Sequence, residues 1–343
     1  MEILSRFKSA ARILLKGDSN KRKRNPIPAI TPEEVAEIKQ FFPREKFFIF
    51  GHARSGTTLL MRLVRLHPEV HCNYQAHFFT RQPLLKSLVD TPDVEEWLKR
   101  KSNRWNRGRD LSPLVLRAAA DFIMERDAAQ AGKPIVGDKS PSSTIHGQAV
   151  RDLRAIYPDA KLIYIVRDGR DVLISERFRN LVEESKFLNA EDKRIVEELR
   201  RNQSQFTNGT RSIFTENVIR RVVKGWVMNL RETEEEGRRL YAQNCYSLRY
   251  EDLLARPFVE MQRLWAFLGV QADTGLERNI FEEMSSNPDE EWQSRRNEDI
   301  ASFLPKGQAG NWQRLFTTRD RSLFKEVAGE ILIKWKYEKD LSW

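Results

Sequence analysis

Short apolar runs recur along the chain, and each is followed by a polar loop. Three of these runs, residues 46–50, 135–137 and 161–166, resemble buried strands, and residues 246–250 are a fourth candidate strand. Residues 59–66 repeat apolar side chains at helical spacing, which predicts a helix after the first run. Strands that alternate with helices indicate a parallel sheet with helices on both faces. We therefore predict an α/β fold in which the loops after the strands gather at one sheet edge, where ligands bind.

Composition divides the chain into an arm and a body. Residues 1–30 are basic and proline-punctuated at their end, so we predict an N-terminal arm there. Residues 31–343 are long enough for one large domain, which begins with the helix-capping pattern Thr31-x-x-Glu34. Within this domain, residues 176–236 are charged, poor in glycine and proline, and helical in pattern, which predicts a helical insertion.

The loop after the first predicted strand has the pattern of an anion-binding site. Gly51 and Gly56 have the spacing of the two glycines in the phosphate-cradling G-x4-G-K-[ST] loop, between a strand and a helix as that loop requires. Glycines let backbone N–H groups curl around an anion, and the helix N-terminus adds a positive partial charge. Four side chains here can donate hydrogen bonds: Arg54, Ser55, Thr57 and Thr58. Because Thr57 replaces the usual lysine, this P-loop-like segment indicates a phosphate that is bound and not hydrolysed.

The net charge and the lack of metal-ligand spacing indicate which kinds of molecule the protein can bind. Lysine and arginine total 59 against 49 aspartates and glutamates, and the net charge of +10 suits nucleotides, acidic glycans or membrane surfaces. The two cysteines are too few for a disulfide framework. Neither they nor the five scattered histidines have the spacing of metal ligands. We expect no nucleic-acid partner, because no aromatic–basic recognition motif accompanies the basic run at residues 21–24.

Residues 1–25 repeat apolar side chains at helical spacing among basic ones. No run among them is long enough to span a bilayer, and they lack the order of a signal peptide. We expect a cytoplasmic protein whose arm can contact a membrane surface peripherally.

Three segments resemble the superfamily of sulfotransferases that use 3'-phosphoadenosine 5'-phosphosulfate (PAPS). The first, FIFGHARSGTTLL, is similar to the 5'-phosphosulfate loop of that superfamily, and its Arg-Ser-Gly-Thr-Thr form resembles tyrosylprotein and bacterial members. The resemblance implies that the loop surrounds the 5'-phosphosulfate with Arg54, Gly56, Thr57 and Thr58, with Ser55 as a further binding candidate among them.

The other two segments resemble the parts of the superfamily that bind the 3'-phosphate. IVRDGRDVLIS is similar to the segment in which an arginine after a strand and a serine eight residues later bind this phosphate, which implies Arg167 and Ser175. LPKGQAGNWQRLFT is similar to the segment that closes over the same phosphate, which implies Lys306 and Gly307. The motifs occur in the same order as in the superfamily and span most of the body.

The reaction that the resemblance implies is a metal-free, in-line displacement that moves a sulfuryl group to an acceptor hydroxyl or amine. We expect Arg54 and Lys139, the latter after a predicted strand, to stabilise the negative charge. Relatives use a glutamate as the base, but Gln75 stands at that position and cannot accept a proton at neutral pH. His77 would lie on the same face if this stretch were an extended strand, and histidine has a suitable pKa, so His77 is our candidate base.

Two other functions compete with this interpretation. A catalytically inactive protein that binds PAPS or its product would also carry these motifs, and Gln75 favours that alternative. A small-molecule kinase of the phosphate-loop class is the other, although the missing loop lysine argues against it. The acceptor remains open among carbohydrate, peptide, lipid and small metabolite.

Overall fold

The structure is a computed structural model and describes residues 28–183, 188–286 and 308–343. Within these residues lies a sheet with five strands in the order β2-β3-β1-β4-β5, and every neighbouring pair is parallel. The strands are β1 (Glu45–Gly51), β2 (Val70–Tyr74), β3 (Ile135–Lys139), β4 (Lys161–Val166) and β5 (Cys245–Arg249). This arrangement confirms the predicted α/β class. The short strand β2 is not among the predicted strands, because its five residues alternate polar with apolar side chains and form no apolar run.

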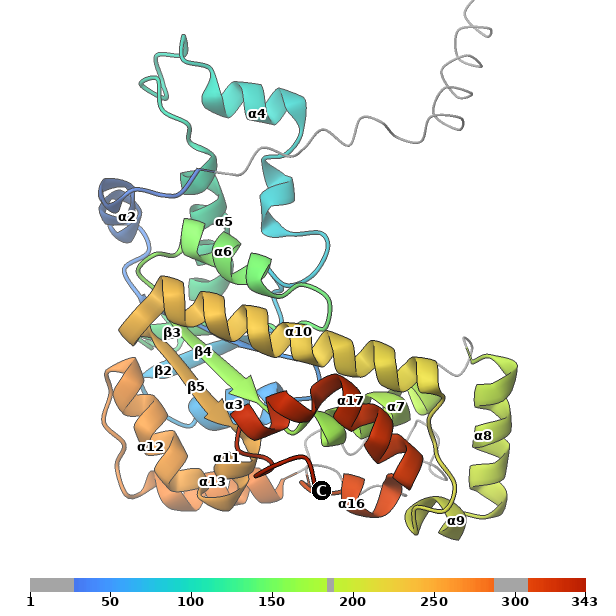
Figure 1. Cartoon of the computed structure of the whole chain (residues 1–343). Coiled ribbons are helices and arrows are strands. Elements are labelled where there is room, and N and C mark those ends of the chain that lie inside the picture. Colours follow the sequence, from blue (N-terminus) through green and yellow to red (C-terminus); the bar gives the residue numbers. More distant parts are fainter. Residues whose placement is uncertain (1–27, 184–187, 287–307) are drawn as a thin grey trace, which may run out of the picture.

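Helices cover both faces of the sheet (Figure 1). Those between β1 and β4 are α3 (Thr57–Val64), α4 (Pro92–Lys99), α5 (Ser112–Gln130) and α6 (Gly147–Ile156), after α2 (Pro32–Lys39) at the start of the body. The later ones are α7 (Gly169–Glu183), α8 (Ala190–Arg201), α9 (Ser204–Thr207), α10 (Glu216–Tyr241), α11 (Tyr250–Ala255), α12 (Pro257–Leu268), α13 (Leu276–Ser285), α16 (Trp312–Leu315) and α17 (Thr318–Lys334). The predicted Thr31–Glu34 capping box begins α2.

Two hydrophobic cores lie against the sheet, one on each face. Successive side chains of a strand point to opposite faces, so Phe48 and Phe50 of β1 enter one core while Phe47 and Ile49 enter the other. The first core contains the buried faces of α5, α6, α10 and α17, and the second those of α3, α12 and α13. Figure 1 shows α10 on one side of the strands and α12 and α13 on the other. Burial on both faces explains the apolar runs of β1, β3 and β4, whereas the outer strands β2 and β5 are less buried.

The segment 176–236 contains α8, α9 and most of α10. The long helix α10 packs against α6, α17 and β4, with Trp226 fully buried. The indole N–H of Trp226 donates to the carbonyl oxygen of Arg167 at 3.2 Å, and its ring lies against Gly169, where a Cβ would come within 2.6 Å of the ring. Helix α10 therefore supports the loop that follows β4.

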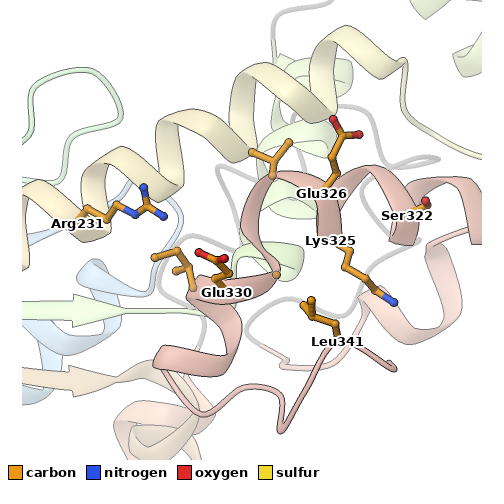
Figure 2. Close-up of a pocket in the computed structure, with 9 residues that line it drawn as sticks. Arg231, Ser322, Lys325, Glu326, Glu330 and Leu341 are labelled. Carbon is orange, nitrogen blue, oxygen red and sulfur yellow. The ribbon is translucent and has the colours of Figure 1, made fainter.

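A hollow of about 600 Å³ lies between α10 and α17 (Figure 2). It is lined by Arg231, Ser322, Lys325, Glu326, Val327, Gly329, Glu330, Ile331 and Leu341. None of the predicted site residues lines it. Each helix in the described ranges is too short or too polar to cross a lipid bilayer.

Candidate functional site

The carboxyl ends of the strands bring the predicted motifs together at one edge of the sheet. Strands β2 and β3 lie on one side of β1 in the sheet, and β4 and β5 lie on the other side. The order therefore reverses between β1 and β4, and ligands of open α/β sheets bind in the crevice at such a point. The P-loop-like segment follows β1, and Arg167 follows β4.

The loop after β1 has a backbone that requires glycine at position 56. Gly56 is the N-cap of α3 with φ 85°, and a Cβ there would lie 2.2 Å from the ring of Tyr250. Arg54 is also left-handed, with φ 70°, and its side chain is exposed. The hydroxyl oxygen of Ser55 is buried, and no described residue forms a hydrogen bond with it. Thr57, the first residue of α3, is buried beside it.

Two arginines and a serine from three segments meet beside this loop. The Nε atom of Arg54 donates to the hydroxyl of Ser175 on α7 at 3.0 Å. The guanidinium of Arg167 donates to the carbonyl oxygens of Arg54 at 3.1 Å and of Gln308 at 2.9 Å. Its carbon Cζ lies 4.8 Å from the centre of the Tyr250 ring, and its Nε is buried without a hydrogen-bond partner among the described residues. The structure thus places both predicted 3'-phosphate residues next to the predicted 5'-phosphosulfate residue.

The predicted residues Lys306 and Gly307 lie outside the described residues. The residues directly after them return to this cluster, since Gln308 contacts Arg167. The carboxylate of Asp171, in the first turn of α7, accepts hydrogen bonds from the backbone N–H groups of Gly310 at 2.6 Å and Trp312 at 3.2 Å. Asp171 therefore anchors the segment 308–312 beside the loop after β4.

Lys139 is the last residue of β3, and its side chain is fully buried. Its ammonium nitrogen donates to the hydroxyl of Thr58 at 3.2 Å and lies 4.0 Å from the centre of the Tyr74 ring. Burial lowers the pKa of Lys139 to about 8, against the opposing effects of Cys72 and Asp138. Lys139 and Thr58 thus join the end of β3 to the first turn of α3.

His77 does not lie on a strand, so the condition under which the sequence placed it on the same strand face as Gln75 is not met. Strand β2 ends at Tyr74, and both Gln75 and His77 have left-handed φ angles, 59° and 54°. The two residues therefore belong to a turn and not to one strand face. The ring nitrogen Nδ1 of His77 lies 2.9 Å from the hydroxyl of Thr80. Burial lowers the pKa of His77, and the positive charges of Arg81 and Lys139 lower it further.

Several contacts at this edge escaped the sequence analysis. Tyr250 lies under both Gly56 and Arg167, and Asp138 and Ser140 bind the turn after β2. One feature of the sequence could have identified these three residues. Each lies at or directly beyond the carboxyl end of a strand, where site residues of parallel sheets gather.

These residues fit an anion with phosphate groups at two ends. Buried polar atoms are normally hydrogen-bonded, so the unsatisfied donors at Ser55 Oγ and Arg167 Nε have the character expected of a ligand site. Arginine and hydroxyl donors beside a helix N-terminus are the groups that proteins use to bind phosphate. In the described ranges, no group of three or more histidine, cysteine, aspartate or glutamate side chains is placed to hold a metal ion.

Comparison with known proteins identifies the family. A model of the sulfotransferase family matches residues 46–274, more than half of the chain. Protein-tyrosine sulfotransferase A of Caenorhabditis elegans is 24% identical over 230 residues, covering 66% of this chain and 50% of the relative. The Drosophila melanogaster protein-tyrosine sulfotransferase is 26% identical over 227 residues, covering 65% and 38%. The chain thus spans half or less of the length of these two relatives.

Among solved structures, a mouse sulfotransferase complexed with PAP is similar with a TM-score of 0.46 and 17% identity, over 89% of this chain and 91% of that one. The sulfotransferase domain from the curacin biosynthetic pathway is similar with a TM-score of 0.47 and 17% identity, over 84% and 97%. The match of the family model is independent of these structural likenesses and extends from β1 past β5. By that match, the chain belongs to the sulfotransferase family.

Proposed function

We propose that this protein transfers a sulfuryl group from PAPS to an acceptor hydroxyl or amine. The observation that carries the proposal is the meeting of Arg54, Ser175 and Arg167 at the switch point of the sheet, where Ser55 Oγ and Arg167 Nε are buried and have no hydrogen-bond partner among the described residues. The family matched by residues 46–274 supports the same chemistry.

The two phosphate-bearing ends of PAPS would be bound by different residues. Arg54, Gly56, Thr57 and Thr58 would hold the 5'-phosphosulfate at the N-terminus of α3, with Ser55 Oγ as an additional donor. The 3'-phosphate would bind Arg167 and Ser175, with Lys306 and Gly307 closing over it. Bound there, PAPS supplies a sulfuryl group attached to a phosphate leaving group.

The positive charges of the site would stabilise the groups that become more negative during sulfuryl transfer. Arg54 and Lys139 are the cations assigned to this role, and the hydrogen bond from Lys139 to Thr58 keeps the ammonium next to the loop. A buried ammonium stabilises nearby negative charge more strongly than an exposed one, because water does not screen it.

His77 is the proton acceptor in this proposal. Its pKa lies below the ordinary value of 6.5, so its imidazole is neutral at pH 7 and able to take the proton of an acceptor hydroxyl. Gln75, in the same turn, has no such capacity. Replacing His77 with alanine should abolish transfer while nucleotide binding persists; retained turnover would assign the proton transfer to another group.

Calorimetric titration separates this proposal from its rivals. The protein is titrated with adenosine 3',5'-bisphosphate, with adenosine 5'-phosphate, and with ATP and magnesium. Tight binding that requires the 3'-phosphate is the expected result, whereas a preference for ATP and magnesium would favour a kinase. Binding without transfer to any acceptor in a subsequent screen with PAPS would favour the inactive nucleotide-binding protein.

The acceptor and the compartment are further proposals. Two relatives are named protein-tyrosine sulfotransferases, so tyrosine peptides come first in the screen, followed by carbohydrates, lipids and small metabolites. We also propose a cytoplasmic enzyme without a nucleic-acid partner, whose residues 1–25 contact membranes peripherally. Flotation of the full chain and of a chain lacking residues 1–25 with anionic vesicles tests that contact, since only the full chain should float.

A further inference from the structure

The turn after β2 has a backbone conformation that needs external support. Gln75 and His77 both have left-handed φ angles although neither is glycine. Such conformations are unfavourable for residues with a Cβ and persist only where surrounding contacts enforce them. One contact comes from the neighbouring strand, because the N–H of Gln75 donates to the carbonyl oxygen of Lys139 at 2.9 Å.

Two side chains at the end of β3 bind the next two N–H groups of the turn. The N–H of Ala76 donates to Oδ1 of Asp138 at 2.9 Å, and the N–H of His77 donates to the hydroxyl oxygen of Ser140 at 2.9 Å. Three successive backbone donors are therefore bound by three successive residues at the end of one strand.

The direction of the hydrogen bonds follows from the chemistry of the groups. Asp138 accepts the hydroxyl proton of Ser140 on Oδ2, which leaves the oxygen of Ser140 to accept from His77. Both side chains are 1% exposed, so water does not compete for them. Burial raises the pKa of Asp138 to about 6, which leaves the carboxylate ionised and able to accept both bonds at neutral pH.

The same strand end also carries the buried cation of the site. Asp138 and Ser140 flank Lys139, whose ammonium binds Thr58 at the P-loop-like segment. The N–H of His77 binds Ser140, the residue next to Lys139, so the histidine and the buried cation are held by the same strand end. The end of β3 therefore fixes both a cation and a histidine relative to the anion loop.

We propose that Asp138 and Ser140 are positioning residues, which hold the turn 75–77 so that His77 faces the acceptor group at the site. The inference rests on the proposed function, in which His77 takes the acceptor's proton. A displacement of about 1 Å in a reacting group can reduce the rate about 100-fold, so loss of these two bonds should reduce turnover and leave nucleotide binding intact.

The test replaces Ser140 with alanine and uses Ser142→Ala as a matched control. Ser142 is buried two residues further along, and its hydroxyl binds the N–H groups of Thr144 and Ile145, away from the turn. We expect S140A to reduce kcat about 10- to 100-fold, with the Kd for adenosine 3',5'-bisphosphate changed less than about threefold. S142A should leave both near the wild-type values.

A second measurement does not depend on activity. The imidazole of His77 is titrated by NMR in the wild type, S140A and S142A, with H77A used to assign its resonance. In S140A the loosened turn should expose His77, and its pKa should rise towards 6.5, whereas S142A should titrate like the wild type. If S140A does not fold, Ser140→Cys, which keeps the shape of the side chain but has only a weakly accepting sulfur, replaces it in both measurements.

The outcomes separate the two proposals. If S140A matches S142A in kcat and in the His77 titration, Asp138 and Ser140 do not position His77 and the inference is wrong. If the wild-type protein neither binds adenosine 3',5'-bisphosphate nor transfers sulfuryl groups, the proposed function is wrong. The His77 titration would still decide whether the two residues hold the turn.

Discussion

The Nε atom of Arg54 donates a hydrogen bond to Ser175 Oγ at 3.0 Å, across a separation of 121 residues in the sequence. The family resemblance assigns these residues to opposite ends of the nucleotide, Arg54 to the 5'-phosphosulfate and Ser175 to the 3'-phosphate. Arg167 adds a second link, because its guanidinium binds the carbonyl oxygen of Arg54. The two segments proposed to bind the phosphates therefore form one connected cluster.

Replacing Arg167 with alanine should affect one end of the nucleotide only. We expect the affinity for adenosine 3',5'-bisphosphate to fall about 10- to 100-fold, the size of a lost charge-assisted hydrogen bond, and the affinity for adenosine 5'-phosphate to change little. Calorimetry measures both. Arg220→Ala is the control, because Arg220 forms exposed ion pairs with Glu216 and Glu326. Equal losses for the two nucleotides would remove the 3'-phosphate assignment.

Replacing Gly56 with alanine should destabilise the protein through two separate effects. The left-handed φ of 85° costs about 1 kcal/mol or more for alanine, and the new Cβ would collide with the ring of Tyr250 at 2.2 Å. Gly132→Ala isolates the first effect, because Gly132 has φ 66° and nothing within 4 Å of a Cβ. In urea unfolding, G56A should therefore lose more stability than G132A. Equal losses would mean that Tyr250 moves aside at little cost.

The pKa of Lys139 predicts how transfer depends on pH. A lysine with a pKa of about 8 loses its positive charge above pH 8, whereas an ordinary lysine keeps it to about pH 10. If the ammonium stabilises charge during transfer, the rate should fall about tenfold for each pH unit above 8. In Lys139→Arg the guanidinium stays charged, so this break should disappear. A break at pH 8 in both proteins would assign it to another group.

The same shift predicts a dependence of stability on pH. The pKa of Lys139 is lower in the folded protein than the ordinary 10.5, so the unfolded chain binds the proton more readily between pH 8 and 10.5. The free energy of unfolding should therefore gain a positive contribution as the pH rises through this window. Urea unfolding of the wild type and of Lys139→Met at pH 8 and pH 10 measures it, and the methionine variant should lack the contribution.

A buried ion network near the start of β1 should matter for stability and not for binding. Asp121 on α5 lies between Arg117, at 2.8 Å, and Lys46, at 3.6 Å, and all three side chains are almost completely buried. Asp121→Ala leaves part of this positive charge uncompensated and should cost about 3 kcal/mol in urea unfolding. Glu45→Ala, which breaks an exposed pair with Lys39, should cost less than about 1 kcal/mol. Nucleotide affinity should stay unchanged in both, since this network is at the opposite end of β1 from the anion loop.

Local sequence patterns predicted four of the five strands, helix α3 and the loop between β1 and α3. Apolar runs identified β1, β3 and β4, which are almost completely buried because both faces of the sheet are covered there. The spacing of Gly51 and Gly56 likewise predicted the loop between β1 and α3. These features depend on neighbours in the sequence, so the sequence by itself was sufficient to predict them.

Tertiary structure alone decided how the turn after β2 is built and where the charges sit. The partners of Ala76 and His77 lie 62 and 63 residues further along the chain, so no local pattern indicates that Gln75 and His77 adopt left-handed backbones. The lowered pKa of Lys139 likewise comes from burial, which depends on how the strands and helices pack. Site chemistry of this kind arises from contacts between distant segments and is fixed only when the chain folds.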